Sequence, residues 1–545
     1  MMQQKQLERF FTIVAIAILF FCSYRAFAPL NTPNLNADRA IHVLMAADLK
    51  LPQDLYYWGQ NRLGSIVPLL SAGLLTILPL SPVVAVSLVQ YGLLLVGYLC
   101  FASLLRHNLS KVILAFAWFL PLPEFIELVY TGQPYAAQLA FLGMAIVLLN
   151  HLLSNLANLN QWQKHGLIVT TVLCLTVSLW ASDFTVVTIG LLLWLVWNKT
   201  HSPLKVNKVG GWWHVSWNIR PELVTVMTTA FLGLSFIVFA KVATDLGGYS
   251  GSLFNFNSPT QVRTVMLRLA TSLVHTLTFQ TDPFKTVAAV LLLVALGYAV
   301  YLLWQQRLKR TSTDHALSEW FYVLGANAVL SVGMLILSQW VYQNDVNFRY
   351  FVVAYVSGWM AVLLLAEALT PVNAKRVQVL LLVAAIAGSL ALPRYVFARE
   401  KPPATVETFR PLTQFAPAGV IGDYWMSYNV CSTDPIGLSC TPHDNQNRMS
   451  CSVTPLPLEK IQGVRCDRCA ERALAADRIL LAKDRWFDQF PDQTTQFGQC
   501  LVRVGEPFSV NKYQFALYYN RTRQQTNAVG QRFPTTGEGG DGIRR

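Results

Sequence analysis

Charged residues are scarce in this chain, and their scarcity excludes most classes of soluble protein. Only 13% of its 545 residues are Asp, Glu, Lys or Arg, whereas 53% are hydrophobic. Soluble globular proteins carry about 25% charged residues. Several apolar runs also reach the roughly 20 residues that a helix needs to cross a bilayer. The sequence therefore predicts an α-helical polytopic membrane protein.

Three motifs of familiar enzymes are missing as well. The sequence has no Gly-x-Ser-x-Gly elbow, no His-Glu-x-x-His motif and no P-loop, which would have indicated a serine hydrolase, a zinc protease or a nucleotide-binding enzyme. The net charge of +13 does not indicate nucleic-acid binding either. Most of the excess lies before residue 405 in short loops, where Lys and Arg act as orientation signals. We predict no nucleic-acid partner.

Hydropathy predicts about 11 transmembrane helices, at 9–28, 83–105, 111–128, 133–153, 166–181, 184–198, 221–243, 284–304, 317–340, 348–369 and 376–392. The first lacks a small-residue cleavage site and is predicted to be a retained helix with its N-terminus inside. A further apolar segment, 64–80, is short and holds two prolines. Counting it as a crossing would move the basic loops outside, against the positive-inside bias. We therefore predict that it lies at the membrane interface.

This topology gathers acidic residues near helix ends on the outer side. They are Asp38, Asp48, Asp54, Glu124, Glu127, Asp183, Asp245, Asp282 and Asp345. Carboxylates close to the hydrocarbon are costly and commonly mark pathways or sites. Each of them alone can equally be a solvated loop charge. Together they indicate a functional site on the outer face.

The composition becomes that of an ordinary globular protein towards the C-terminus. Residues 1–392 form the predicted transmembrane core, with a first outer loop at 29–82, and 393–410 is a Pro-rich linker. A small extracytoplasmic α/β domain is predicted at 411–525, because "AGVIGDYW", "DRILLAKDRW", "QCLVRVG" and "YQFALYY" have the composition and boundaries of strands. Residues 526–545 are predicted to be a disordered tail.

Six of the nine cysteines belong to this outer domain: Cys431, Cys440, Cys451, Cys466, Cys469 and Cys500. An even number of cysteines in an oxidising compartment predicts disulfides, although the sequence leaves their pairing open. Two alternatives are free thiols and a zinc site, in which "CDRC" would be completed by Cys440, Cys451 or His443.

The first outer loop combines a helical pattern with aromatic residues. "DRAIHVLMAADL" has apolar residues at helical spacing and predicts a helix along the membrane surface. Asp38 stands at its start, where the helix dipole favours a carboxylate, and a plain capping role is the alternative. In "LYYWGQNRLGS", Trp58 suits the membrane interface and Arg62 can bind an anionic head group.

These features resemble the GT-C superfamily of membrane glycosyltransferases, whose members include protein O-mannosyltransferases and the lipid A aminoarabinose transferase. The resemblance rests on an acidic residue soon after the first helix, the surface helix, and "YYWGQNRLGS" leading into a short apolar segment. It covers the chain in outline. O-mannosyltransferases have an Asp-Glu pair where this chain has Asp38-Arg39. The resemblance implies a GT-C-like helical core with an extracytoplasmic C-terminal domain.

The resemblance also implies a reaction, in which a sugar moves from a polyprenyl-phosphate donor to a glycan, lipid or protein acceptor. The acceptor must lose a proton, and a carboxylate within reach can take it. Asp38 is the hypothesised general base. In the second outer loop, "LPLPEFIELVYTGQPY" offers Glu124, Glu127 and Tyr135. Glu124 would orient the acceptor or help hold a divalent cation, and the metal requirement is left open.

Arg349 and Tyr350 resemble an Arg-Tyr pair at a similar helix entry in these enzymes. Arginine binds phosphate through two hydrogen bonds and stays charged, so Arg349 is the hypothesised main phosphate partner. The alternatives are that Arg349 extends to the interface and that Glu124 and Glu127 are solvated helix ends. The amphipathic segment 259–277 is predicted to rest on the membrane, or else to cover the donor head group.

The leading hypothesis is a glycosyltransferase of a bacterial inner membrane, with a cytoplasmic N-terminus and a periplasmic C-terminal domain. One alternative is a transporter or flippase of lipid-linked glycans, which would show internal repeats and interrupted helices at mid-membrane. A second is an O-antigen ligase or polymerase, expected to place its key loop late in the chain. A membrane-anchored binding protein is the third.

Overall fold

The computed structural model describes residues 2–200, 204–209, 212–217, 221–244, 255–308, 317–444, 451, 464–483 and 489–521. The chain forms two compact units. The first, called here the helical unit, comprises Met1–Asn34, Asp48–Asp245 and Ser250–Ala404. The second, the C-terminal unit, contains Leu35–Ala47 as well as Thr405–Arg545, so part of the first outer loop belongs to it. The predicted tail at 526–545 lies outside the described residues.

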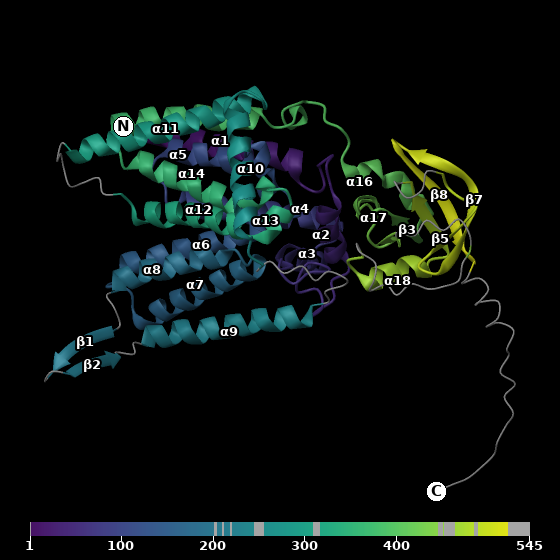
Figure 1. The fold of residues 1–545 in the computed structure, drawn as a ribbon, viewed down its shortest axis with the longest axis horizontal. Coiled ribbons are helices and arrows are strands. Elements are labelled where there is room, and N and C mark those ends of the chain that lie inside the picture. Colours follow the sequence, from purple (N-terminus) through teal and green to yellow (C-terminus); the bar gives the residue numbers. More distant parts are fainter. Residues whose placement is uncertain are drawn as a thin grey trace, which may run out of the picture. The chain divides into compact units, whose positions relative to one another are not determined.

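Nine helices in the described part of the chain are long and apolar enough to cross a membrane, and each matches a predicted span. They run alongside one another as a bundle (Figure 1). These helices are α1 (Met2–Phe27), α4 (Pro82–Ala102), α6 (Tyr135–Asn155), α7 (Gln161–Ala181), α9 (Pro221–Ala243), α11 (Pro283–Leu308), α12 (Glu319–Leu337), α14 (Val352–Glu367), which η2 (Phe348–Phe351) precedes, and α15 (Pro371–Leu390). The protein is a multi-pass membrane protein, as predicted.

The two other predicted spans are shorter apolar helices. These are α5 (Asn108–Phe119), with 12 residues, and α8 (Thr185–Thr200), with 16. Twelve residues reach about 18 Å, well short of the hydrocarbon thickness. The helix predicted at 111–128 therefore ends early, because prolines follow Phe119 and the 3-10 helix η1 (Pro123–Leu128) takes the rest. The segment predicted at the interface forms α3 (Ile66–Ile77), also 12 residues long.

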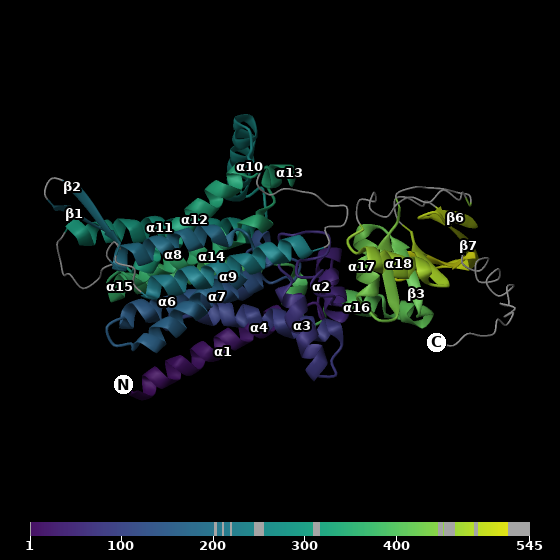
Figure 2. The same ribbon diagram turned by 90° about the horizontal axis from the view of Figure 1, so that it is seen from below.

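Shorter elements complete the helical unit. Figure 2 shows α10 (Pro259–Leu277) and α13 (Gln339–Gln343) standing away from the bundle. A hairpin of β1 (Leu204–Val209) and β2 (Trp212–Trp217) extends from the bundle between α8 and α9, and η3 (Arg394–Val396) follows α15. Within the bundle, buried hydrogen bonds join three helices. Thr188 donates to Asn327, and Asn327 donates to Ser357, each over 2.8 Å.

One end of the bundle joins loops that were predicted to face inward. The backbone N–H of His107, after α4, donates to Glu367 at the end of α14 over 2.9 Å. Lys199 at the end of α8 lies 2.7 Å from Glu319 at the start of α12. Basic residues of the short loops thus meet carboxylates at helix ends.

The opposite end joins loops that were predicted to face outward. Lys285, in the first turn of α11, lies 2.7 Å from Glu124 of η1. Lys241, near the end of α9, lies 3.0 Å from Asp183 between α7 and α8. The helices therefore alternate in direction as the predicted topology requires, and acidic residues of separate outer loops meet basic residues at this end.

The C-terminal unit is the predicted α/β domain, built on one six-stranded mixed sheet. The strands are β3 (Ala418–Gly422), β4 (Leu438–Pro442), β5 (Arg478–Ala482), β6 (Gln493–Gln496), β7 (Gln499–Val510) and β8 (Tyr513–Asn520), in the order β4-β3-β5-β8-β7-β6. Strand β3 runs parallel to β4 and β5, and the other pairs are antiparallel. The helices of this unit are α2 (Ala37–Ala47), α16 (Thr405–Thr408), η4 (Arg410–Phe415), α17 (Tyr424–Cys431) and α18 (Asp467–Ala475).

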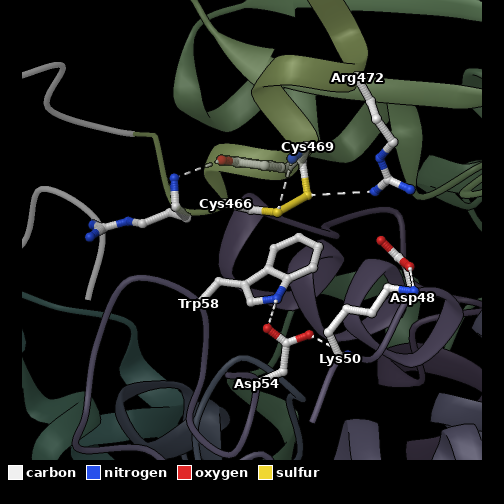
Figure 3. The surroundings of a disulfide bond; sticks show 9 residues. Asp48, Lys50, Asp54, Trp58, Cys466, Cys469 and Arg472 are labelled. Atoms are coloured by element: carbon white, nitrogen blue, oxygen red, sulfur yellow. Dashed lines mark hydrogen bonds and ion pairs between the residues drawn. A yellow bond between two sulfur atoms is a disulfide. The ribbon is translucent and has the colours of Figure 1, made fainter. Parts of the chain in front are cut away.

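The prediction of disulfides is confirmed. The bonds are Cys431–Cys440, Cys451–Cys500 and Cys466–Cys469. Figure 3 shows the last of these, with Nη2 of Arg472 3.8 Å from Sγ of Cys469. The "CDRC" cysteines bond to each other, so in this state they offer no thiolates to zinc.

Candidate functional site

A cavity of about 480 Å³ lies in the helical unit, at the end that was predicted to face outward. It brings together three of the predicted site residues, Glu124, Glu127 and Arg349. Helix α10 also contributes to the cavity lining. This is compatible with the prediction that the segment 259–277 rests on the membrane. The complete lining is Pro123, Glu124, Ile126, Glu127, Arg268, Leu269, Ser272, Asp345, Val346, Asn347, Phe348 and Arg349.

The local sequence explains how η1 presents both glutamates to the cavity. Proline at 121 and 123 prevents continuation of α5 and leaves a short 3-10 helix. Residues three apart lie on the same face of such a helix, which places Glu124 and Glu127 together. The ring of Phe125 stacks on Tyr355 of α14, with 4.3 Å between the ring centroids, and fixes η1 against the bundle.

A strained turn before η2 supplies another part of the cavity lining. Asp345 and Val346 both have positive φ angles, of 54° and 57°. A β-branched residue rarely adopts this conformation, which costs on the order of 1–3 kcal/mol. The Val346 side chain is buried, and its N–H donates to the carbonyl of Val341 over 2.9 Å. The packing therefore holds a turn whose Asp345, Asn347 and Arg349 all line the cavity.

The cavity contains charges of both signs. Its lining has the carboxylates of Glu124, Glu127 and Asp345 and the guanidinium groups of Arg268 and Arg349. Arg268 lies 2.8 Å from Asp345 in an ion pair whose Asp345 side chain is 90% exposed. Such exposed pairs contribute only about 0–1 kcal/mol. The guanidinium group of Arg268 can therefore turn towards an anionic ligand at little cost.

Two predicted tyrosines contact Arg349. The hydroxyl of Tyr135 donates to the Arg349 carbonyl over 2.5 Å, and Nη2 of Arg349 donates to the Tyr350 hydroxyl over 2.6 Å. The guanidinium carbon lies 4.8 Å from the centre of the Tyr350 ring. Neither tyrosine lines the cavity. Their contacts are those of residues that position Arg349.

A second cavity of about 460 Å³ adjoins the first and shares Arg268, Ser272 and Asp345 with it. It extends along α10 past Thr264, Leu267, Thr271, His275 and Thr281. The Arg268–Asp345 ion pair therefore lies where the two spaces meet. The opposite side of α10 exposes Met266, Leu273 and Val274.

Two other predicted residues lie outside both cavity linings. The guanidinium carbon of Arg62 lies 3.9 Å from the centre of the Trp340 ring, and its Nε donates to Gln60 over 2.7 Å. Trp58 is buried and its Nε1 donates to Asp54 over 3.0 Å (Figure 3). These contacts organise the first outer loop, and the local pattern of residues did not indicate any of the three partners.

Arg62 belongs to a charged group at the end of α9. Burial raises the pKa of the Asp183 carboxyl, while the charges of Lys241 and Arg62 act in the opposite direction. Lys241 also lies 5.5 Å from the centre of the buried Tyr56 ring. The group ties the first outer loop to the α7–α8 turn, which supports the loop structurally.

Asp38 lies in the C-terminal unit, in the first turn of α2. The Tyr424 hydroxyl of α17 donates to its Oδ1 over 2.7 Å. The capping alternative for Asp38 is wrong, because the Asn36 side chain accepts the hydrogen bond from the Arg39 N–H. Nearly all of α2 is buried within the protein, and its position along the membrane surface stays a prediction.

Four residues of this arrangement carried no site prediction. Arg268 and Asp345 had been noted only as members of an amphipathic helix and of an acidic set. Tyr424 had been noted only within the segment "AGVIGDYW", and Lys285 had no local signal. Lys285 pairs with Glu124 across 161 residues, and Tyr424 reaches Asp38 across 386. A sequence pattern describes near neighbours, so pairs this distant require the fold.

The chain is similar to known proteins in its structure and not in its sequence. No protein-family model matches the chain, and no curated protein matches it by sequence. A solved structure of the archaeal oligosaccharyltransferase AglB from Archaeoglobus fulgidus, in complex with an inhibitory peptide and a dolichol-phosphate, shares 11% identity and a TM-score of 0.39, covering 87% of this chain and 69% of its own. ArnT from Cupriavidus metallidurans in the apo state shares 9% identity and a TM-score of 0.40, covering 94% of this chain and 98% of its own. The likeness concerns the fold alone.

Proposed function

We propose that this protein is an integral membrane glycosyltransferase, which moves a sugar from a polyprenyl-phosphate donor to a glycan, lipid or protein acceptor. The reaction would take place at the outer, periplasmic face of a bacterial inner membrane. One observation carries the proposal. The cavity of the helical unit combines Arg268 and Arg349 with Glu124 and Glu127, at the end of the helix bundle that was predicted to face outward.

The arginines suit the charged part of such a donor. Guanidinium groups bind phosphate oxygens through paired, charge-assisted hydrogen bonds. As the sugar–phosphate bond breaks, the phosphate gains negative charge, and fixed cations stabilise that charge. Arg349 is the proposed main phosphate ligand, with Tyr135 and Tyr350 holding it in place.

The surroundings of the cavity suit the lipid part. Met266, Leu273 and Val274 of α10 are 52–55% exposed, on the side of the helix away from the cavity that it lines. A prenyl chain stays in the hydrocarbon while its phosphate sits at the interface. An amphipathic helix with exposed apolar residues and a cavity-lining Arg268 provides both environments.

The proposed chemistry balances as a single displacement. The acceptor oxygen or nitrogen attacks the anomeric carbon of the sugar, and the bond from that carbon to the phosphate oxygen breaks. The prenyl phosphate leaves with the electron pair, and the acceptor proton passes to Asp38 as general base. Glu124, held by Lys285, is proposed to orient the acceptor.

No step of this scheme is assigned to a metal ion. In the described ranges, no group of three or more His, Cys, Asp or Glu side chains is arranged to hold one. A divalent cation held near Glu124 and Glu127 is a separate part of the proposal, which would add to the cationic groups. Turnover measured with and without a chelator tests it directly.

The test uses the purified full-length protein, a panel of prenyl-phosphate sugars and a crude acceptor extract. Release of prenyl phosphate is followed by mass spectrometry for the parent and for Arg349→Ala, with Arg263→Ala as the matched control. Arg263 lies on α10 and is exposed, and it lines neither cavity. We expect release by the parent and the control and a large loss in Arg349→Ala. A parent that releases no prenyl phosphate from any sugar contradicts the proposal, and movement of intact donor across vesicles would then favour a flippase.

A further inference from the structure

The proposed base has a specific hydrogen-bond partner in the C-terminal unit. Tyr424, the first residue of α17, donates its hydroxyl to Oδ1 of Asp38 over 2.7 Å. Burial and the nearby Asp38 charge raise the pKa of Tyr424 well above its usual value. The phenol therefore stays protonated and remains a hydrogen-bond donor throughout the physiological range.

Tyr424 is itself held by Arg465. The guanidinium carbon of Arg465 lies 5.5 Å from the centre of the Tyr424 ring, within the range of a cation–π contact. The backbone N–H of Arg465 donates to the hydroxyl of buried Tyr428 over 3.1 Å. The Tyr424 and Tyr428 rings meet edge to face with 5.5 Å between their centroids. Tyr424 is thus held by two contacts, one from Arg465 before α18 and one from Tyr428, a turn further along α17.

A disulfide anchors the residue that follows Arg465. Cys466 is the N-cap of α18, and its Sγ accepts from the Cys469 N–H over 3.2 Å. The bond from Cys466 to Cys469 closes this first turn. Helix α18 packs closely on β3, since a Cβ atom at Gly419 would come within 2.1 Å of the Ala473 carbonyl oxygen. Covalent and packing constraints therefore lead from the sheet to Arg465.

We infer that Tyr424 is the positioning residue of Asp38, and that the C-terminal unit thereby orients the general base of the transfer reaction. This inference rests on the proposed function. A carboxylate with one oxygen held by a fixed donor keeps its plane and its distance from the acceptor, and misplacement by about 1 Å can cost on the order of a hundredfold in rate. Arg465 and the Cys466–Cys469 disulfide act through Tyr424.

A merely structural role for Tyr424 predicts a different set of effects. The hydrogen bond would then connect α2 to α17, and its loss would lower the unfolding temperature without a selective change in the chemical step. A positioning role places the loss in kcat and leaves the KM for the donor unchanged, because donor binding does not require an oriented base. The two roles are therefore separated by kinetics and stability together.

The experiment measures kcat, the KM for the donor and the unfolding temperature of Tyr424→Phe, Asp38→Asn and the double variant in the full chain. Tyr519→Phe is the matched control, since it removes a hydroxyl from a half-buried tyrosine of β8 in the same unit. Arg465→Met is a second variant that leaves both Asp38 and Tyr424 in place. We expect kcat to fall by about tenfold to a hundredfold in Tyr424→Phe and by less in Arg465→Met. We expect no further fall when Tyr424→Phe is added to Asp38→Asn.

Failure of the inference and failure of the proposed function give different results. An active parent whose kcat survives Tyr424→Phe, or a loss that adds fully to that of Asp38→Asn, overturns the positioning role and leaves the transferase intact. A parent that turns over no donor overturns the proposed function, and the catalytic role of Tyr424 with it. A fall in kcat equal to that of Tyr519→Phe also counts against the inference.

Discussion

The helical unit and the C-terminal unit hold their charged residues in different ways. In the helical unit, Arg268 and Asp345 form an exposed ion pair beside a cavity, and Glu124 pairs with a partly exposed Lys285. In the C-terminal unit, Asp38 accepts from a tyrosine that a ring contact and a nearby disulfide hold in place. Exposed pairs open at little cost and suit groups that must exchange partners for a ligand. A constrained hydrogen bond suits a group that must keep its orientation.

The largest expected effect concerns Asp38, the residue held by a constrained hydrogen bond in the C-terminal unit. Asp38→Asn keeps the shape of the side chain and removes its basicity, so we expect transfer to fall by about 10²–10⁴-fold. Prenyl phosphate release by the folded variant is the measurement, and circular dichroism checks the fold. Retained turnover would move the proposed base to Glu124 or Glu127 in the helical unit, and would reverse the roles assigned to the two units.

The next effect tests which covalent bond supports the C-terminal unit. Cys451–Cys500 spans 49 residues of sequence, whereas Cys466–Cys469 spans 3. The chain-entropy estimate gives about 4 kcal/mol for the longer loop and about 2 kcal/mol for the shorter one. We expect paired Cys→Ser substitution of Cys451 and Cys500 to lower the unfolding temperature more, and substitution of Cys466 and Cys469 to lower kcat more. Equal effects on both quantities would show that the short disulfide has no special link to Asp38.

A smaller effect is expected for Arg349, in the cavity of the helical unit. Arg349→Lys keeps the positive charge and loses the planar fork that binds two phosphate oxygens. We expect kcat/KM for the donor to fall by about tenfold to a hundredfold, in line with the loss of one or two charge-assisted hydrogen bonds. Steady-state kinetics with varied donor measures it. An Arg349→Lys variant with parental kcat/KM would indicate a charge that contacts no phosphate.

The smallest expected effect is a dependence of the stability of the C-terminal unit on pH. Burial lowers the pKa of His42 on α2 from 6.5 to about 3. The unfolded chain therefore takes up a proton below pH 6.5 while the folded chain does not, and stability falls as the pH decreases from 6.5 towards 3. The slope from this one group is at most about 1.4 kcal/mol per pH unit. Unfolding temperatures of the parent and His42→Gln at pH 7.5, 6 and 5 test it, and the difference between the two should shrink as the pH falls. A constant difference would show that His42 titrates normally.

Local patterns predicted the elements well where length and hydropathy suffice. Nine of the spans are long apolar helices, and the strands expected in "AGVIGDYW", "DRILLAKDRW", "QCLVRVG" and "YQFALYY" correspond to β3, β5, β7 and β8. Strands β4 and β6 were missed, because "LSCTP" and "QTTQ" are short and polar or contain proline. The early end of α5 was missed although the prolines after it were visible.

The sequence by itself determined the class of the protein and the alternation of its helices, and it favoured disulfides over zinc ligation or free thiols for the outer cysteines, because composition and spacing along the chain carry that information. The tertiary structure alone decided which cysteines pair, that Glu124, Glu127 and Arg349 share a cavity with Arg268, and that Trp58 and Arg62 do not line it. It also decided that Asp38 belongs with Tyr424, 386 residues away. The physical reason is that a side chain's partners depend on how distant segments pack, and hydropathy and helical periodicity describe only the faces that each segment presents.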